Sequence, residues 1–148
     1  MHLNGTHLLQ ASPQEIWKLL MDIDVLARIT PAISRLEPLG GDKYKAIAEV
    51  KLGPVKGSFS GDMEIVNKQE PEQFTLLIQQ NSRMGNVSAE GQIKLQAAGD
   101  NQTEVAFNGD AKLSGTLARM GQRVLGGVAN SMVRQFFENL EKELNATA

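Results

Sequence analysis

The sequence predicts an α+β fold, in which a curved antiparallel sheet wraps around a long C-terminal helix and two short helices follow the first strand. Three observations predict it. Apolar and polar residues alternate through most of residues 43–113, as in strands with one dry face. A capped helix signal precedes this region, and residues 116–144 carry apolar side chains at helical spacing. A sheet with one apolar face needs a cover, and the last helix is the element large enough to provide it.

Length and composition exclude several classes of protein. The chain has 148 residues, which suits one domain over residues 1–148, and a net charge of -2, which gives no basic field for nucleic acid. It has no cysteine, so disulfides, thiolate catalysis and cysteine-ligated metals are excluded. No window approaches ~20 consecutive apolar residues, and the N-terminal residues lack the pattern of a signal peptide. We therefore expect a cytoplasmic protein whose membrane contact is peripheral at most.

The first helix is predicted by its cap. In "SPQEIWKLL", Ser12 suits the N-cap, Pro13 the first helical position and Glu15 the third, which together form a capping box. The following "DVLARI" and "PAIS" are expected to form a short, irregular helical continuation that Pro31 breaks.

The strands are predicted by their inner faces. Turn signals at "GGD", "GP", "EPE", "RMGN" and "AAGDNQ" separate the alternating runs. The residues expected to face the core are Tyr44, Ala46, Ala48, Val50 and Leu52; Val55, Gly57, Phe59, Gly61, Met63 and Ile65; Phe74, Leu76, Ile78 and Gln80; Val87, Ala89, Gly91, Ile93 and Leu95; and Thr103, Val105, Phe107, Gly109, Ala111 and Leu113.

Glycine is unexpectedly common on these inner faces. In "GPVKGSFSGDMEI", Gly57 and Gly61 point inward although glycine weakens a strand. Such glycines either let the strand bend, as a sheet around a helix must, or leave an empty place beside Phe59 and Met63. The same bending role is expected for Gly91 and Gly109.

The last helix is expected to run from about Thr116 to Leu144 as one element, roughly 40 Å long. One apolar stripe contains Leu117, Gly121, Val124, Val128, Met132, Phe136, Leu140 and Leu144. Gly121, Gly126 and Gly127 each weaken a helix interior by roughly 1 kcal/mol relative to alanine. Two explanations stay open: close packing against the sheet, or a flexible gate over a cavity.

Two segments resemble the family of the carbon monoxide dehydrogenase G subunit. They are "LARITPAISRLEPLGGDKYKAIAEVKLGPVKGSFSGDMEI" and "GQRVLGGVANSMVRQFFENLE". The resemblance implies the helix-grip (START-like) fold, whose members often hold an apolar ligand between the sheet and the C-terminal helix. It also implies an association with molybdenum hydroxylase-type enzymes, their recruitment to the membrane and their quinone acceptor.

The predicted ligand site is the inner face of the sheet and the facing side of the last helix. Its small residues leave space, and its large apolar residues form walls that suit an apolar guest. The candidate ligand-binding residues are Ala48, Gly57, Phe59, Gly61, Met63, Ile78, Ala89, Phe107, Met120, Val124, Val128 and Met132.

No catalytic set is predicted. His2 and His7 lie an odd number of residues apart on one strand, so they face opposite sides and cannot share a metal there. The polar residues Gln80, Thr103 and His7 are too sparse for an acid–base pair. We expect no catalytic, cofactor-binding or metal-binding residue, and hence no cofactor.

The interpretation is a non-catalytic accessory protein that binds a hydrophobic small molecule. From the resemblance, that molecule would be a quinone or an isoprenoid lipid, and the partner a molybdenum hydroxylase-type enzyme. Two alternatives remain: a protein–protein adaptor or assembly factor without a ligand, and a START-like cyclase or hydrolase.

Overall fold

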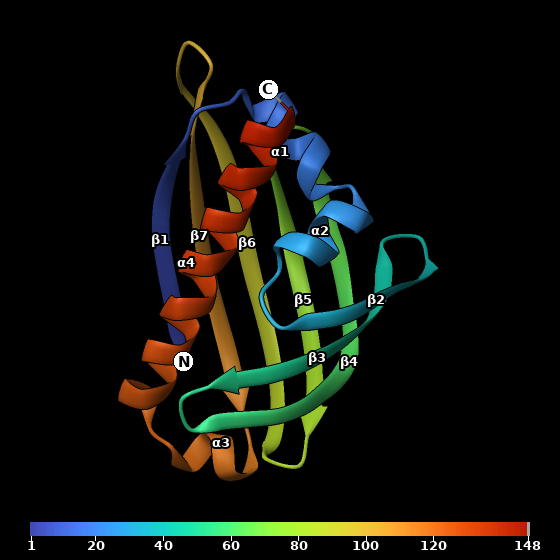
Figure 1. Cartoon of the computed structure of the whole chain (residues 1–148), viewed down its shortest axis with the longest axis vertical. Coiled ribbons are helices and arrows are strands. Elements are labelled where there is room, and N and C mark those ends of the chain that lie inside the picture. Colours follow the sequence, from blue (N-terminus) through green and yellow to red (C-terminus); the bar gives the residue numbers. More distant parts are fainter. Residues whose placement is uncertain (148) are drawn as a thin grey trace.

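The computed structural model describes residues 1–147, with side chains through residue 146 (Figure 1). The strands in this part of the chain are β1 (His2–Leu9), β2 (Ile33–Gly40), β3 (Lys43–Leu52), β4 (Val55–Gln69), β5 (Gln73–Ser82), β6 (Gly85–Gly99) and β7 (Gln102–Leu113). The helices are α1 (Pro13–Leu20), α2 (Ile23–Ile29), α3 (Gly115–Arg119) and α4 (Gln122–Thr147).

The described strands form one antiparallel, seven-stranded sheet in the order β1-β7-β6-β5-β4-β3-β2. Strands β2 to β7 pair as a meander, and β1 completes the edge beside β7. Figure 1 shows β2, β3 and the first part of β4 running across the direction of the other strands, while α4 lies over the concave side. The predicted α+β helix-grip architecture is confirmed.

A close approach of two backbones bends β4. A Cβ atom on Gly61 would overlap the carbonyl oxygen of Gln79 in β5 and lie 2.8 Å from its carbonyl carbon. Four residues earlier, Gly57 has a φ of 137°, a conformation that other residues rarely adopt. The glycines of β4 thus have the bending role that the sequence predicts. By contrast, a Cβ on Gly91 would meet no described atom within 4 Å.

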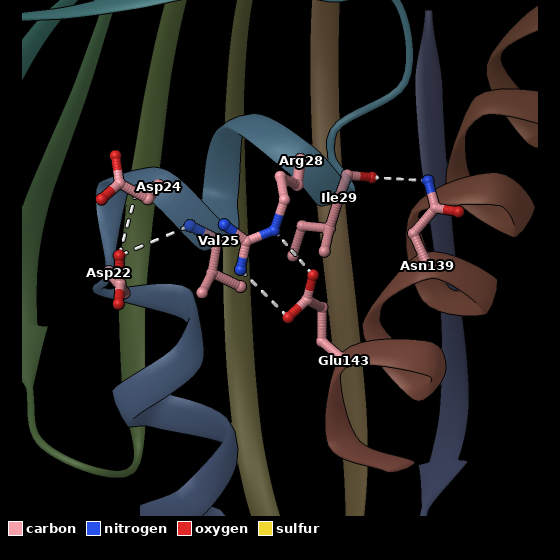
Figure 2. A network of polar contacts seen from close by, with 7 residues as sticks. All are labelled: Asp22, Asp24, Val25, Arg28, Ile29, Asn139 and Glu143. Atoms are coloured by element: carbon pink, nitrogen blue, oxygen red, sulfur yellow. Dashed lines mark hydrogen bonds and ion pairs between the residues drawn. The ribbon is translucent and has the colours of Figure 1, made fainter. Parts of the chain in front are cut away.

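Both short helices begin with side-chain caps. The backbone N–H of Glu15 donates to Ser12 Oγ over 3.2 Å at the start of α1, which confirms the predicted N-cap. Asp22 caps α2 by accepting from the N–H groups of Asp24, at 3.0 Å, and Val25, at 3.4 Å (Figure 2). These caps satisfy backbone donors that would otherwise lack partners.

Polar contacts fasten α2 to α4 (Figure 2). Asn139 Nδ2 donates to the carbonyl oxygen of Ile29 over 3.0 Å. The Arg28 guanidinium donates to both carboxylate oxygens of Glu143, at 2.9 and 3.2 Å. The paired geometry of an arginine and a carboxylate fixes direction as well as distance, so the helices are held in one relative position.

The expected helical continuation through "PAIS" is wrong, because these residues lead into β2. Helix α2 ends at Ile29, where the Thr30 hydroxyl donates to the Leu26 carbonyl oxygen over 2.7 Å. Pro31 disfavours a helical conformation at the residue before it, and Ala32 has a φ of 69°, which redirects the chain. From Ile33 onward the backbone pairs with β3.

The expected single C-terminal helix is also wrong, since Gly121 divides it. Its φ of 87° is left-handed, so α3 ends and α4 starts in a new direction. Within α4 the contacting face also differs from the predicted stripe: Leu125 is buried, whereas Val124 is 40% exposed. The predicted stripe runs in one helical phase through Gly121, and because the helix is divided there, the contacting face of α4 does not continue that phase.

Two groups of buried residues divide the interior. One lies at the α1–α2 end and contains large side chains, including Trp17, Phe74, Phe137 and Leu140. The other lies toward α3 and contains Ala48, Val50, Val55, Phe59, Leu117 and Leu125. The first group is thus richer in bulky residues: alanine and valine make up three of its fourteen described members, but three of the six in the second group.

The close approach at Gly61 predicts a sharp contrast between two glycines of the sheet. Gly61→Ala should lower the free energy of unfolding by about 1–3 kcal/mol, because the methyl group overlaps a backbone that cannot yield cheaply. Gly91→Ala is the matched control and should change stability by about 1 kcal/mol or less. Urea unfolding of the two variants measures both values. Equal stabilities would contradict this account of the bend.

The ion pair between α2 and α4 predicts a pH dependence. The hydrogen bond from Arg28 lowers the pKa of Glu143, and the opposite charge adds to that effect. A carboxylate with a lowered folded-state pKa stabilises the fold above its unfolded pKa of about 4.3, and this stabilisation is lost as pH falls through the folded value. The stability gap between wild type and Glu143→Gln should therefore be largest near pH 7 and close as pH falls below about 4. Glu141→Gln removes an exposed charge from the same helix and should show no such gap.

Candidate functional site

An apolar pocket of about 280 Å³ lies in the half of the molecule that contains α3. This volume is near the lower end of the range for small-molecule sites, about 300–1,000 Å³. Elements from most of the described chain contribute to it. Its lining consists of Met1, Thr30, Pro31, Ile33, Ala46, Ala48, Val50, Val55, Phe59, Met63, Ile78, Gln80, Val87, Ala111, Leu113, Leu117, Leu125, Val128, Ala129 and Met132.

Short side chains on facing elements leave room for the pocket. Every second residue of β3 faces inward, which brings Ala46 and Ala48 to the lining. Ala111 of β7 and Ala129 of α4 contribute further short side chains. The larger Phe59 pairs with Ala48 across the two strands and forms part of the wall.

Six of the twelve candidate ligand-binding residues line this pocket. The structure brings together Ala48, Phe59, Met63, Ile78, Val128 and Met132. These residues come from β3, β4, β5 and α4, so the sequence pattern identified facing elements that are far apart in the chain. Ligand contact by the twelve residues stays a prediction.

The other six candidates lie outside the lining. Gly57 is exposed, and Val124 is 40% exposed on the outer side of α4. Phe107 packs with the large side chains of the opposite end, and Met120 packs beside the pocket cluster. Ala89 pairs with two lining residues, Ile78 and Ala111. Gly61 lies between Ala46 and Gln80, where its missing side chain makes room for the neighbouring strand and leaves no hollow.

The glycines of α4 do not serve close packing. Apart from its chain neighbours and the nearby backbone of α4, a Cβ on Gly126 or Gly127 would meet no described atom within 4 Å, so the close-packing explanation is wrong for both. A flexible gate remains a prediction for this segment, which lies between the lining residues Leu125 and Val128.

The polar side chains of the described lining are those of Gln80 and Thr30. The Gln80 amide donates from Nε2 to the carbonyl oxygens of Ala46, at 3.4 Å, and Gln79, at 3.2 Å. Its Oε1 atom is shielded from solvent and has no partner among the described residues. The Thr30 hydroxyl donates to Leu26 and so has its own proton engaged.

No residue of the described lining has an ionisable side chain, so no acid–base pair faces the pocket. His7 lies elsewhere: its ring stacks on Phe137 with centroids 3.9 Å apart. His2 faces the other side of β1, where Nδ1 lies 2.8 Å from Asp110 Oδ1. Among the described residues no group of three or more His, Asp or Glu side chains could hold a metal ion. The arrangement is suited to binding an apolar molecule.

Several lining residues escaped the sequence-based candidate list. Thr30 and Pro31 come from the α2–β2 connection, whose path the sequence predicted wrongly, and Ile33 is the first residue of β2. Leu125 was missed because the predicted stripe passed through Val124. The signal for Gln80 was present: it is a polar residue on an otherwise apolar inner face.

In the described chain no helix has the length and apolar character needed to cross a membrane.

Comparison with solved structures identifies close structural relatives. A conserved protein from Geobacillus kaustophilus is 33% identical, with a TM-score of 0.97 over 99% of this chain and 97% of that one. A START superfamily protein from Mycobacterium smegmatis is 13% identical, with a TM-score of 0.80 over 99% of both chains. A protein from Thermus thermophilus is 15% identical, with a TM-score of 0.78 over 100% of this chain and 99% of that one. The last two support the START-like fold alone.

No curated protein matches the chain. The family of the carbon monoxide dehydrogenase G subunit (CoxG) matches residues 5–145, which is nearly the whole sequence and includes every strand of the sheet in full or in large part. Together with the helix-grip architecture, this match confirms the family indicated by the two resembling segments: the chain belongs to the carbon monoxide dehydrogenase CoxG family.

Proposed function

We propose that this protein is a non-catalytic carrier that binds a hydrophobic small molecule in the pocket beneath α4. The observation that carries the proposal is the pocket itself, whose described lining is almost entirely apolar. Burial of apolar surface supplies non-directional binding energy, so such a pocket accepts guests by size and hydrophobicity. The lack of an ionisable side chain in the described lining favours binding over the cyclase or hydrolase alternative.

The proposed ligand is a quinone or the first part of an isoprenoid lipid. Support comes from the family, whose name refers to a subunit of a redox enzyme, and from the apolar lining. The volume of about 280 Å³ suits a ring or a short chain segment rather than a complete long-chain lipid. The proposed partner is a molybdenum hydroxylase-type enzyme, which this protein would help to recruit to the membrane or the quinone pool.

A basic surface at the pocket end suits peripheral contact with the cytoplasmic face of a membrane. We call this surface the basic end. Its exposed side chains are those of Lys51 and Lys56 beside the β3–β4 turn, Arg83 in the β5–β6 turn, and Arg119 and Arg123 at the α3–α4 junction. None of these forms a salt bridge with another described residue.

The basic end is continuous with the pocket. The N–H of Leu117 in α3 donates to the carbonyl oxygen of Met84 in the β5–β6 turn over 2.9 Å. Leu117 also lines the pocket together with Val55, the first residue of β4 after the β3–β4 turn. Lys51 and Lys56 are directly opposite in the β3–β4 pair, an unfavourable arrangement that an anionic surface would relieve. The exposed Val124 adds an apolar side chain beside Arg123.

Filling the pocket should weaken ligand binding without changing the fold. Ala129→Leu places a larger side chain in the lining and keeps a good helix former in α4. Its affinity for the uncharged probe N-phenyl-1-naphthylamine, measured by fluorescence titration, should fall about tenfold or more. The matched control is Ala146→Leu at an exposed position of the same helix, which should bind like wild type. If wild type binds neither the probe nor a quinone analogue, this result would favour the adaptor alternative.

The basic end predicts charge-selective vesicle binding. Sedimentation should show stronger binding to phosphatidylglycerol vesicles than to phosphatidylcholine vesicles, and the difference should shrink with added salt. Arg119→Gln with Arg123→Gln should weaken the anionic binding about 20- to 30-fold, at about 1 kcal/mol for each charge. Lys94→Gln with Lys142→Gln removes the same charge from exposed positions outside the basic end. Equal losses in both double variants would show that only net charge matters and would reject a dedicated surface.

A further inference from the structure

We propose that the pocket selects apolar ligands that carry a hydrogen-bond donor, and that Oε1 of Gln80 accepts this hydrogen bond. The inference rests on the proposed function and specifies the chemistry of its ligand. For a quinone-type ligand it assigns the preferred form: the reduced hydroquinone, which has hydroxyl groups, rather than the oxidised quinone, which has only acceptor oxygens.

The inference starts from an unsatisfied polar atom. Among the described residues, Gln80 Oε1 is a side-chain acceptor shielded from solvent and without a hydrogen-bond partner. Buried polar atoms in folded proteins are nearly always paired, because an unpaired one loses its hydration without compensation. Oε1 is shielded in this arrangement, but Gln80 lines the pocket, so a turn of its side chain would present the oxygen to a molecule bound there.

The neighbouring backbone assigns which amide atom is the nitrogen and which is the oxygen. Nε2 carries two hydrogens, and the carbonyl oxygens of Ala46 and Gln79 lie 3.4 and 3.2 Å from it. If the amide were flipped, Oε1 would face both of these acceptors instead. Because the hydrogen-bond network assigns the amide, the atom left without a partner is the oxygen.

The bend of β4 makes this orientation available. Ala46, Gly61 and Gln80 form one row across β3, β4 and β5. Since Gly61 has no side chain, the Gln80 side chain extends over β4 and reaches the carbonyl of Ala46 in the second strand away. The residue that bends the sheet thus also permits the contact that orients the amide.

Thr30, the other polar side chain of the described lining, also presents an acceptor oxygen. Thr30 uses its hydroxyl hydrogen to reach the Leu26 carbonyl oxygen at 2.7 Å, so its oxygen can only accept from a ligand. The charged N-terminal amino group at Met1 uses one of its three hydrogens toward the carbonyl oxygen of Ala111, over 2.7 Å. The polar side chains of the described lining therefore offer acceptors to a guest.

A pocket with this polarity discriminates by hydrogen-bond donors. A ligand hydroxyl pairs with Oε1, and the broad terminal torsion of glutamine lets the oxygen turn toward it. A ligand with only carbonyl or ether oxygens leaves Oε1 unpaired and brings a further acceptor beside it. One net hydrogen bond of this kind corresponds to an affinity ratio of about three- to tenfold.

The test compares two ligands of nearly equal size and hydrophobicity. Displacement of N-phenyl-1-naphthylamine gives the affinities of 1-dodecanol and dodecyl methyl ether for wild type, Gln80→Met and Gln79→Met. We expect wild type to prefer the alcohol about three- to tenfold. Gln80→Met keeps the length of the side chain and removes the acceptor, so the preference should disappear while the ether binds as before. The control Gln79→Met lies at an exposed neighbouring position and should keep the preference.

The outcomes separate this inference from the proposed function. If wild type binds both compounds equally, the donor selectivity is overturned and the carrier function stands. If wild type binds neither compound nor the naphthylamine probe, both proposals fail. A preference that persists in Gln80→Met would also overturn the assignment to Gln80. For the redox form, 2-methyl-1,4-naphthohydroquinone should bind more tightly than 2-methyl-1,4-naphthoquinone in the absence of oxygen, and the reverse order would overturn that part.

Discussion

The close approach of Gly61 to the Gln79 carbonyl is the constraint on which the pocket half of the molecule depends. At this point β4 and β5 come nearer than any side chain on the inner face of β4 would allow. The first part of β4 and its neighbours β2 and β3 can then turn across the sheet, as Figure 1 shows. A flat sheet would present its apolar face to solvent or to a flat layer of helices. The curved sheet of this protein instead wraps around the N-terminal part of α4. The bend of β4 therefore helps to enclose the pocket.

The C-terminal part of α4 is held by contacts that do not involve the pocket. Contacts from α2 reach Asn139 and Glu143, while Phe137 and Leu140 enter the cluster of large side chains. This end supplies a densely filled core, in which loss of a large side chain would cost several kcal/mol. The segment around Gly126 lies in the other half, beside short side chains. The large buried side chains and the pocket thus lie in opposite halves, so a guest of the proposed carrier would exchange without disturbing the main core.

The sequence predicted the faces of the strands better than the path of the connections. Alternation is a local property, and it correctly placed Ala46, Ala48 and Phe59 inward. The turn at Ala32 and the division at Gly121 depend on left-handed backbone conformations that apolar periodicity does not report. These two errors account for missed lining residues such as Pro31 and Leu125.

The candidate site was predicted in part for a related reason. An inner face can be recognised from spacing, but which portion of that face is filled depends on distant elements. Phe107 and Met63 both point to the concave side, yet only Met63 lies at the pocket, because α4 and α1 cover the other end with large side chains. Gln80 was recognised as an inward polar residue, but its unpaired oxygen follows from the positions of Ala46 and Gln79 across the sheet.

Apolar burial and the Gln80 oxygen have different roles in a carrier. Burial favours any guest of suitable size, so by itself it gives affinity without orientation. A single acceptor in an apolar wall adds direction and disfavours guests that cannot donate a hydrogen bond. Gln80 lies two residues before the end of β5, close to the turn that contributes Arg83 to the basic end. A molecule with an apolar body and a hydroxyl group would meet both properties at the same end of the protein, where an anionic membrane surface is proposed to contact it. Such a guest would be held by many weak contacts and one directional contact, a combination that allows selection and release without chemistry.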